Sequence, residues 1–554
     1  MADLSPPDRR LRVSGLELPL GEEDSALRGI ASQKLGLAEE ELRGLRMVRK
    51  SIDLRGRHKG RAPRWIVQAD VSVPPRARSK KLARLLENGK VKEAPAPTSL
   101  VVDADRAEEF RGAEPKRAVI VGAGPGGTFA ALALALSGVR VTVLERGARI
   151  DERSKRLARF HRTREVDRES NLLFGEGGAG TYSDGKLYTR VVDPLEHNVL
   201  QELVRAGARE DILWEARAHI GTDRLHFVLP KLRERLEELG VEFAWETRFE
   251  GLVKDAADPA KVRAVTTSAG ELPCDALFVA MGHSAEDTWC QLACDGVAFE
   301  SKPFQLGVRV EHPQELIDEA RHGTGPEAAL LGAASYNLVA KKEGDVQGAH
   351  SFCMCPGGKI VASINLPGML CTNGMSNSTH ASPWANAAVV TTYTDADFGP
   401  GPFAAVEFRK RLEERFFEAG GGDFSAPSQR VPDFLAGRET KNPGRTSYTF
   451  GAVPGRLDEL LPPSGVAALR RALSRFDGLV KGYAGEHGLM VGIESRSSGP
   501  VRMPRERDTR VATGFHNLYP VGEGAGFAGG IMSAALDGVH SAQALLRHGI
   551  SVGR

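Results

Sequence analysis

Residues 118–147, AVIVGAGPGGTFAALALALSGVRVTVLERG, restrict the possible folds of this chain more than any other stretch. They begin with a continuous apolar run, Ala118–Val121, which is typical of a parallel strand buried on both faces. A glycine-rich turn and an apolar helix follow, and Val139–Leu144 is a second apolar strand. The turn has the GxGxxG spacing and consists of Gly122, Ala123, Gly124, Pro125, Gly126 and Gly127.

This strand–turn–helix–strand pattern predicts a dinucleotide site. The first glycine permits a sharp turn, the second lets the main chain approach a pyrophosphate, and the third lets the helix pack on the strand. Main-chain N–H groups and the positive end of the helix then face the phosphates. Glu145 ends the second strand, where a carboxylate accepts hydrogen bonds from ribose hydroxyls, and Arg146 follows it. The acid favours FAD or NAD over NADP, and the alternative is a βαβ unit that binds nothing.

Composition narrows the class of protein. The chain has 554 residues, so we expect several domains. Its hydrophobic content of 41%, charged content of 26% and net charge of +2 are those of an ordinary globular protein with no general attraction to nucleic acid or membranes. We see no apolar run long enough for a bilayer, no secretory signal and too few cysteines for a disulfide framework. We expect a cytoplasmic protein with a small-molecule substrate, no metal and an oligomeric state that the sequence leaves open.

The N-terminal residues 1–75 have a βαββ pattern and predict a small α+β module, ferredoxin-like in type. A basic stretch within it is interpreted as a solvated sheet face and hairpin loop, with an anionic partner or RNA as the alternative. We do not adopt the nucleic-acid alternative, because no stacking aromatic residues accompany the charges. The stretch contains Arg43, Arg46, Arg49, Lys50, Arg55, Arg57, Lys59, Arg61 and Arg64.

The whole chain is predicted to be α/β, with a Rossmann-like cofactor domain and a β-rich substrate domain inserted into it. Within the inserted domain, Gln305–Glu311 and Ala387–Tyr393 are expected strands, and residues 351–364 are expected to form a hairpin with a Pro-Gly turn. The predicted division is 1–75 for the N-terminal module, 76–114 for a helix and linker, 115–300 and 491–554 for the cofactor domain, and 301–490 for the substrate domain.

Three more segments add candidate cofactor contacts. A glycine-rich loop at residues 175–185 offers main-chain amides to an anion or a flavin edge, and a buried strand ends at residues 280–282. The loop 522–530 precedes the last helix, whose N-terminus would favour the negative charge of a reduced flavin, while its acid accepts from a ribityl chain. The candidates are Gly178, Ala179, Gly180, Thr181, Ser183, Asp184, Gly185, Phe249, Ala280, Met281, Gly282, Gly522, Glu523, Gly529, Gly530 and Ile531.

Two other features have both a functional and a structural interpretation. Cys353 and Cys355 invite a redox role, but their Cα atoms on one strand would be too far apart for an easy bridge, so packing thiols are preferred. A metal would need two more ligands at matched spacing. His283 follows a buried strand and is interpreted as a loop cap, with catalysis as the alternative.

Several of these motifs carry a resemblance to a known family. GAGPGG…ERG and NLYPVGEGAGFAGGIMSAALDG look like the FAD-binding fold of the glutathione-reductase superfamily. FGEGGAGTYSDGKL, AMGHSAEDT, SFCMCPGG, NGMS and GIESRSSGPVRMP resemble a bacterial family of uncharacterised FAD-dependent (FAD-utilising) dehydrogenases. The resemblance covers nearly the whole chain and implies FAD with a β-rich substrate domain. It supplies no substrate, and the absence of a CxxxxC pair makes disulfide-reductase chemistry doubtful.

The expected function is that of a FAD-dependent oxidoreductase acting on a small organic substrate. The flavin carries the electron chemistry and the protein orients the substrate. Candidate catalytic groups are Lys186, His350 and Arg496; the arginine would grip a carboxylate or, alternatively, form an interdomain ion pair. NAD(P)H is a potential transient reductant. The alternatives are a flavin-bound binding or regulatory protein and a monooxygenase.

Overall fold

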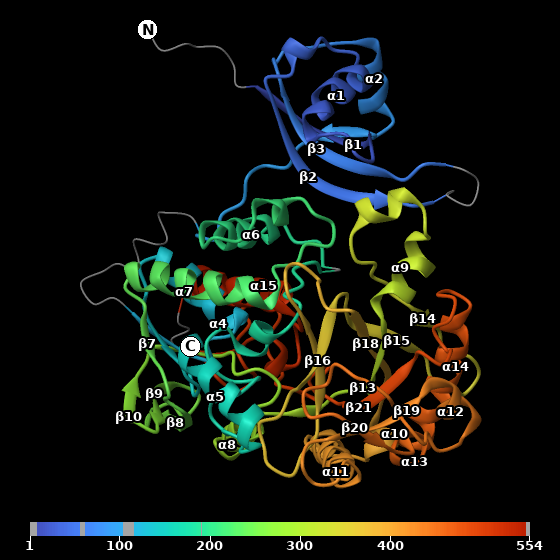
Figure 1. Cartoon of the computed structure of the whole chain (residues 1–554). Helices are drawn as coiled ribbons and strands as arrows, with labels where there is room; N and C mark the ends of the chain where they lie inside the picture. Colours follow the sequence, from blue (N-terminus) through green and yellow to red (C-terminus); the bar gives the residue numbers. More distant parts are fainter. Residues whose placement is uncertain (1–7, 56–60, 103–115, 190, 550–554) are drawn as a thin grey trace. The chain divides into compact units, whose positions relative to one another are not determined.

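The computed structural model describes residues 8–55, 61–102, 116–189 and 191–549 (Figure 1). The chain divides into two compact units. One contains the N-terminal residues as far as Thr98 together with Arg209–His219 and Thr324–Gly332. The other contains Ser99–Ala208, Ile220–Gly323 and the chain from Ala333 onward.

The first unit is an antiparallel sheet with two helices. Its strand order β2-β3-β1-β4 and its βαββαβ chain order are those of ferredoxin-like modules. Alternating side chains of β1 and β3, such as Leu11, Val13 and Val71, are fully buried in its core. The elements are β1 (Arg9–Pro19), α1 (Leu27–Leu35), β2 (Gly44–Asp53), β3 (Arg64–Val73), α2 (Lys80–Glu87) and β4 (Val91–Glu93), with short 3₁₀ turns at Asp24–Ala26 and Glu39–Glu41.

This module extends beyond the expected boundary at residue 75. The short strand β4 forms hydrogen bonds along the open edge of β1, and Val91 is buried in the same core. The chain at Lys50 also pairs with Trp214 and Ala216, which brings the turn Glu210–Leu213 (η5) into this unit. Part of the expected linker at 76–114 is therefore an integral element of the module.

The basic stretch of the module is largely neutralised by its own acids. The buried carboxylate of Asp70 accepts from Arg12 at 2.7 Å and from Arg46 at 2.9 Å. Asp53 accepts from Arg55 at 2.8 Å. These pairs support the interpretation of a charged sheet face. Arg57 and Lys59 lie outside the described residues.

The second unit contains a parallel sheet of order β23-β11-β5-β6-β7, to which the GxGxxG segment contributes β5, α4 and β6. Helix α15 packs against α4 so closely that a Cβ on Gly538 would lie 2.0 Å from the carbonyl oxygen of Gly126. The strands are β5 (Arg117–Val121), β6 (Arg140–Leu144), β7 (Glu242–Ala244), β11 (Ala276–Val279) and β23 (Leu518–Pro520). The helices around them are α4 (Pro125–Leu136), α5 (Ile150–Thr163), α6 (Glu196–Arg205), α7 (Thr222–Glu238), α8 (Glu286–Cys294) and α15 (Ile531–His548).

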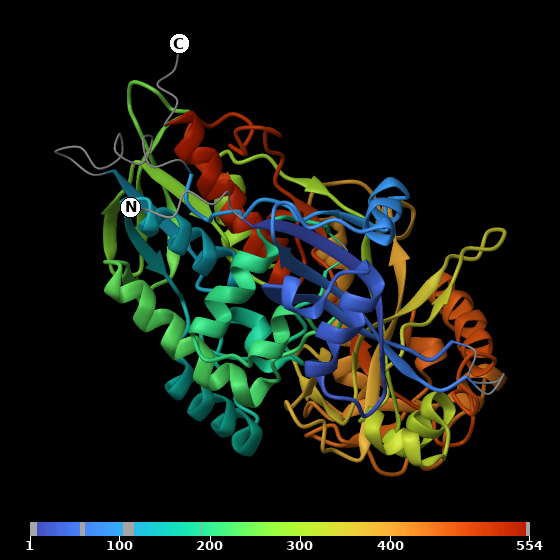
Figure 2. The same cartoon turned by 90° about the horizontal axis from the view of Figure 1, so that it is seen from above.

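Between β7 and β11 the chain forms the antiparallel excursion β8 (Phe249–Lys254), β9 (Val262–Thr267) and β10 (Gly270–Pro273). In Figures 1 and 2, the red helix α15 lies among the teal and green segments of the parallel sheet, although it comes from the far end of the chain. The carboxyl ends of β5, β11 and β23 therefore open onto one region that distant segments share.

A mostly antiparallel sheet of order β14-β15-β18-β13-β21-β19-β20 forms the rest of this unit, coloured yellow to orange in Figure 2. The apolar side chains of β13 and β18 lie at the centre of its core. Its strands are β13 (Phe304–Pro313), β14 (Val339–Ala340), β15 (Ala349–Cys355), β18 (Trp384–Tyr393), β19 (Ala426–Arg430), β20 (Ala452–Pro454) and β21 (Leu489–Glu494). Its helices are α9 (Gln314–His322), α10 (Asp395–Phe398), α11 (Ala404–Ala419), α12 (Val431–Ala436), α13 (Leu457–Leu460) and α14 (Pro463–Asp477).

Two expectations for this region differ from the structure. The hairpin predicted at 351–364 is wrong, because β15 pairs with β18 while β16 (Gly358–Ala362) pairs with β17 (Thr372–Ser376). The Pro-Gly turn instead carries the chain from one sheet to another. The expected boundary at 490/491 falls inside β21, and the chain returns only at β22 (Val501–Arg502), which pairs with β12 (Glu300–Ser301).

Candidate functional site

The glycines of the first turn serve two different purposes. A Cβ on Gly122 would lie 2.5 Å from the carbonyl oxygen of Ala280, and a Cβ on Gly127 would lie 1.9 Å from that of Gly122. These two positions need glycine for the fold itself. A Cβ on Gly124 would meet nothing closer than 3.9 Å. The protein leaves this space open at the N-terminus of α4, where a phosphate group finds main-chain donors.

A cavity lies in front of this turn, and most of the expected residues line it. The expected residues in its wall are Gly122, Gly124, Pro125, Gly126, Glu145, Arg146, Gly178, Ala179, Gly180, Ser183, Asp184, Gly185, Lys186, Phe249, Ala280, Met281, Gly282, Arg496, Gly522, Glu523, Gly530 and Ile531. They come from segments far apart in the sequence, from the first glycine turn to Arg496 and the start of α15, which the fold brings together.

Four expected cofactor residues lie behind the cavity wall. Ala123 donates its N–H to Glu145, and Gly127 packs against the turn. The hydroxyl of Thr181 is buried and donates to the carbonyl of Glu176. Gly529 lies against the carboxylate of Glu523, which its Cβ would approach within 2.8 Å. These residues shape the wall and do not face the cavity.

His350 does not line the cavity either. It pairs in β15 with Val339 on one side and Val390 on the other. Phe352 and Cys353, further along the same strand, reach the cavity in its place. The structure therefore does not bring His350 to the cavity, and its expected catalytic role has no support in this geometry.

Glu145 joins three loops at the end of β6. Its carboxylate accepts main-chain N–H groups from Ala123, Gly147 and Gly175, each at 2.9 Å. A Cβ on Gly147 would lie 2.5 Å from the nitrogen of Gly175, so the two loops are in direct contact. A carboxylate has about four acceptor positions, and three of them hold these loops in place. Glu145 therefore mainly fixes the cavity wall. One acceptor position of its carboxylate remains for another donor.

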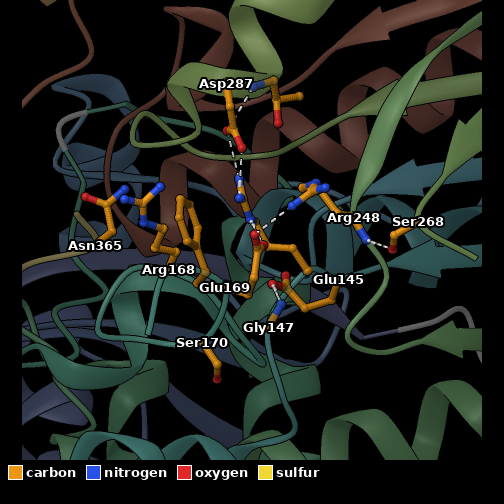
Figure 3. Close-up of polar contacts among 12 residues, drawn as sticks. Glu145, Gly147, Arg168, Glu169, Ser170, Arg248, Ser268, Asp287 and Asn365 are labelled. Carbon is orange, nitrogen blue, oxygen red and sulfur yellow. Dashed lines mark hydrogen bonds and ion pairs between the residues drawn. The ribbon is translucent and has the colours of Figure 1, made fainter. Parts of the chain in front are cut away.

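A charged cluster borders the cavity next to Glu145, through Arg146 and Arg248. The guanidinium of Arg146 donates to Glu169 at 2.8 Å and to both oxygens of Asp287 at 2.8 Å. Arg248 donates to the other oxygen of Glu169 at 2.9 Å. Figure 3 shows this cluster with Glu145 and Gly147 beside it. Because Arg146 also lies 4.4 Å above the ring of Phe174, it presents a flat, neutralised surface to the cavity.

The loop 171–185 is held by an arginine that the sequence analysis did not single out. Arg153 on α5 is fully buried and donates to the carbonyls of Asn171, Leu172 and Glu176. Burial lowers the pKa of Arg153 to about 10, so the side chain stays charged at neutral pH. The glycine loop is consequently a fixed wall of the cavity.

The opposite wall begins at α15. The loop Gly522 to Gly530 includes the turn η7 (Glu523–Ala525), and Asp537 on α15 accepts the N–H of Gly522 at 2.8 Å. Arg505 donates to both oxygens of Asp537, which keeps this buried acid charged. The first turn of α15 reaches the cavity through Gly530, Ile531 and Ala534. A second helix N-terminus thereby faces the same space as that of α4.

Glu523 and His283 form the titratable pair of this wall. Burial raises the pKa of Glu523 to about 7, although Lys302 opposes the shift. Burial and the charges of Arg409 and Arg496 lower the pKa of His283 to about 3. The Nε2 atom of His283 lies 3.7 Å from a Glu523 oxygen. At neutral pH the histidine is neutral, so this contact is not an ion pair.

Lys186 is a fixed cation in the cavity wall. Its Nζ lies 2.8 Å from an oxygen of Asp184 and donates to the carbonyl of Met354. The neighbouring acid and thiols raise its pKa against the opposing effect of burial. A lysine that stays protonated cannot serve as a general base.

Arg496 is committed to a structural ion pair. Its Nε and Nη2 donate to the two oxygens of Glu413 at 3.0 and 2.8 Å, and Nη1 donates to Asn365 at 2.7 Å. Both side chains are buried, and Arg409 lies 3.8 Å from the same carboxylate. The fork that was expected to grip a substrate carboxylate is occupied by Glu413. Of the two interpretations in the sequence analysis, the ion pair describes the structure.

The remaining lining residues are mostly apolar or small and follow no recognisable spacing. They are Val121, Leu144, Leu173, Phe174, Thr247, Arg248, His283, Ser284, Ala285, Thr288, Phe352, Cys353, Asn373, Ser497, Val521, Ala528 and Ala534. Within the described ranges, no group of three or more His, Cys, Asp or Glu side chains is placed to hold a metal ion. None of the helices in the described parts of the chain has the length and apolar character to cross a bilayer.

Comparisons with known proteins agree with this geometry. Residues 116–280 match the family described as "FAD binding domain", and residues 303–497 match "FAD-dependent protein, C-terminal domain-like". An uncharacterized protein of Clostridium beijerinckii is 37% identical over 542 residues, which are 97% of this chain and 98% of that protein. The "FAD binding domain" match contains the glycine turn and Glu145, and it indicates FAD as the cofactor of the chain.

Solved structures with similarity to the chain include an oxidase, a flavin-dependent halogenase and a complex with FAD. Glycine oxidase from Geobacillus kaustophilus is 12% identical with a TM-score of 0.34, over 79% of this chain and 97% of that one. The flavin-dependent halogenase CmlS is 13% identical with a TM-score of 0.36, over 79% and 60%. CtdE in complex with FAD is 10% identical with a TM-score of 0.31, over 78% and 84%. Scores of this size do not discriminate between reactions.

Proposed function

The chain belongs to the same family as the uncharacterized Clostridium beijerinckii protein, and on this premise we propose that it is a FAD-dependent oxidoreductase acting on a small organic molecule. The main support for the proposal is the set of elements that surround the cavity. Two helix N-termini and three glycine-rich loops surround it, and the 303–497 region supplies polar groups to the same space. The more specific assignment, a dehydrogenase that resembles the FAD-utilising family, is part of the proposal.

The cavity residues fit the parts of FAD. The open space at Gly124 and the first turn of α4 suit the pyrophosphate. The flat surface of Arg146 and Phe174 beside Glu145 suits the adenosine end. The 178–185 loop and the first turn of α15 would hold the flavin end. When bound, FAD accepts or donates a hydride or electrons, chemistry that amino-acid side chains do not supply.

The protein controls charge and protons around that group. The positive end of α15 favours negative charge in its neighbourhood. Glu523 has a pKa near 7 and His283 is neutral, so the pair can hold a proton at the wall and release it near neutral pH. Neither group needs a metal or a second cofactor for this role.

The substrate is proposed to enter on the side of the 303–497 region. Phe352, Asn373 and Ser497 supply an apolar face and two polar side chains there. Lys186 adds a positive charge held by Asp184. This combination suits a small, polar or anionic organic molecule with an apolar part.

Anaerobic reduction of the purified chain tests the proposal. We expect a yellow protein whose flavin absorbance is bleached by NADH, by NADPH, or by the substrate itself. Bleaching by a nicotinamide would identify a reductase, and bleaching only by an organic donor would identify a dehydrogenase. Uncoupled peroxide formation with oxygen incorporation would identify a monooxygenase instead. Failure to bleach with nicotinamides and with a broad panel of small organic donors would contradict an oxidoreductase and favour a flavin-bound regulatory protein.

A further inference from the structure

The strand β15 is interrupted at Cys353, where it borders the cavity. The pairing with β18 shifts between Phe352 and Cys355, so that an extra residue bulges out of the strand. Cys353 has a φ of 44°, in the left-handed region that non-glycine residues rarely adopt. Backbone strain of this kind persists only when surrounding contacts enforce it, and it concentrates at functional sites.

Two buried cations hold the bulge in place. Lys186 donates to the carbonyl of Met354, and Arg309 donates to the carbonyl of Cys353 at 2.9 Å. Arg309 is itself fully buried and bound by both oxygens of Glu494. The consecutive carbonyls of Cys353 and Met354 are thus held by side chains from different elements. The conformation is fixed by charged hydrogen bonds and not by packing alone.

The bulge brings two thiols together. The Sγ atom of Cys355 donates to the carbonyl of Cys353 at 3.3 Å, which holds the second thiol against the residue that carries the first. Cys353 lines the cavity, whereas Cys355 is fully buried behind it. The neighbouring thiol, Lys186 and Arg309 lower the pKa of Cys353, while the pKa of Cys355 is raised. A thiol of lowered pKa at the cavity next to a partner of raised pKa is the pairing that disulfide formation uses.

We propose that Cys353 and Cys355 are a redox-active dithiol that exchanges two electrons with the FAD of the same cavity. In the oxidising direction the two S–H bonds break, one S–S bond forms, and two electrons and two protons pass to the oxidised flavin. In the reverse direction the reduced flavin returns them and the S–S bond breaks. The proposal rests on the proposed function, because FAD in this cavity is the oxidant and the reductant of the pair.

The other thiols of the chain lack these features. Cys290 and Cys294 are exposed on α8, and Cys274 and Cys371 are buried. None of these four cysteines is among the residues that line the cavity. The sequence analysis preferred the interpretation of packing thiols. Packing accounts for the buried Cys355. It does not account for Cys353, which is strained, half-buried and faces the cavity.

Counting electrons in the FAD-loaded chain tests the proposal. In an anaerobic titration of the oxidised protein with dithionite, we expect about four electrons per flavin, two for the flavin and two for the disulfide. The variants Cys353→Ser and Cys355→Ser should each take about two, and the matched control Cys290→Ser should take as many as the unmodified chain. If the unmodified chain takes only the electrons of its flavin, or if both variants keep the extra pair, the proposal is wrong.

Mass spectrometry gives an independent reading that does not require the variants to fold. Trypsin should release both cysteines on the single peptide 343–359. After denaturation and alkylation without reductant, this peptide from the oxidised holoprotein should resist alkylation and be lighter by two hydrogens, while Cys290 is alkylated. Full alkylation of both cysteines would contradict the proposal. A chain that carries flavin but fails these tests overturns the dithiol alone, whereas a chain without flavin overturns the proposed function.

Discussion

The carboxylate of Glu145 accepts the main-chain N–H of Gly175 at 2.9 Å and so ties the end of β6 to the glycine loop that follows α5. The same carboxylate holds Ala123 in the first glycine turn and Gly147 in its own loop. One side chain thereby sets the distance between two walls of the cavity. The three loop contacts use the carboxylate of Glu145 whether or not a ribose is bound.

Replacing Glu145 by glutamine should weaken FAD binding and lower the stability of the FAD-free chain. The amide keeps one acceptor oxygen but turns an N–H₂ group toward N–H donors, which leaves buried donors unsatisfied at a cost of about 1–3 kcal/mol. Thermal unfolding and FAD titration of the variant measure both effects. Glu238→Gln, at an exposed position of α7, is the matched control and should change neither. A variant with normal stability and weak FAD binding would assign Glu145 to the ligand alone.

The glycines of the turn should separate ligand binding from folding. Gly124→Val places a side chain in space that the protein leaves open, at an extended φ of −76°, so we expect a folded chain that no longer retains FAD. Gly127→Ala pushes a methyl group into the carbonyl of Gly122, so we expect a loss of stability of about 1–3 kcal/mol. Melting temperature and flavin content of the two purified variants check this contrast. Retention of FAD by folded Gly124→Val would place the pyrophosphate elsewhere.

Glu523 should make the stability of the FAD-free chain depend on pH. Its pKa of about 7 lies above the ordinary value of 4.5, so the folded state binds more protons between these values. The free energy of unfolding should therefore fall as pH rises from about 4.5 to about 7, by at most about 3 kcal/mol from this group, and then level off. Glu523→Gln should lose this contribution and be the more stable chain above pH of about 7. Denaturant titrations at several pH values measure it, and parallel curves for the two chains would contradict the account.

Arg496 should act on folding through Glu413. Arg496→Met leaves a buried carboxylate with fewer partners, which typically costs about 3–5 kcal/mol. The double variant Arg496→Met with Glu413→Leu should recover part of that loss, because it removes the orphaned charge. Chemical denaturation of the two variants and the unmodified chain gives the coupling. Unchanged stability in Arg496→Met would instead favour the original interpretation of a substrate-binding fork.

Much of the second unit follows from local sequence signals. The apolar run, the glycine spacing and Glu145 predict β5, α4 and β6, because each signal acts within a few residues. The late loop at 522–530 is predicted for the same reason, since a strand, a glycine turn and a helix lie in sequence. The helix α15 and the strand β13 also lie close to their expected bounds.

The contacts between distant segments could not be predicted in this way. Arg153 looks like any surface arginine of a basic helix until the fold buries it against the 171–185 loop. The partner of Arg496 is Glu413, more than eighty residues earlier, and no spacing rule joins them. Cys353 and His350 share a strand, but the bulge decides that Cys353 borders the cavity. Such facts depend on tertiary pairing and on strain that only the whole fold enforces.

The amount of FAD bound per chain tests the central claim most directly. The account predicts that the purified protein carries about one non-covalent FAD per chain, that denaturation releases it, and that Gly124→Val abolishes it while the chain stays folded. A properly folded, unmodified chain that is colourless and takes up no FAD when offered it would contradict the account.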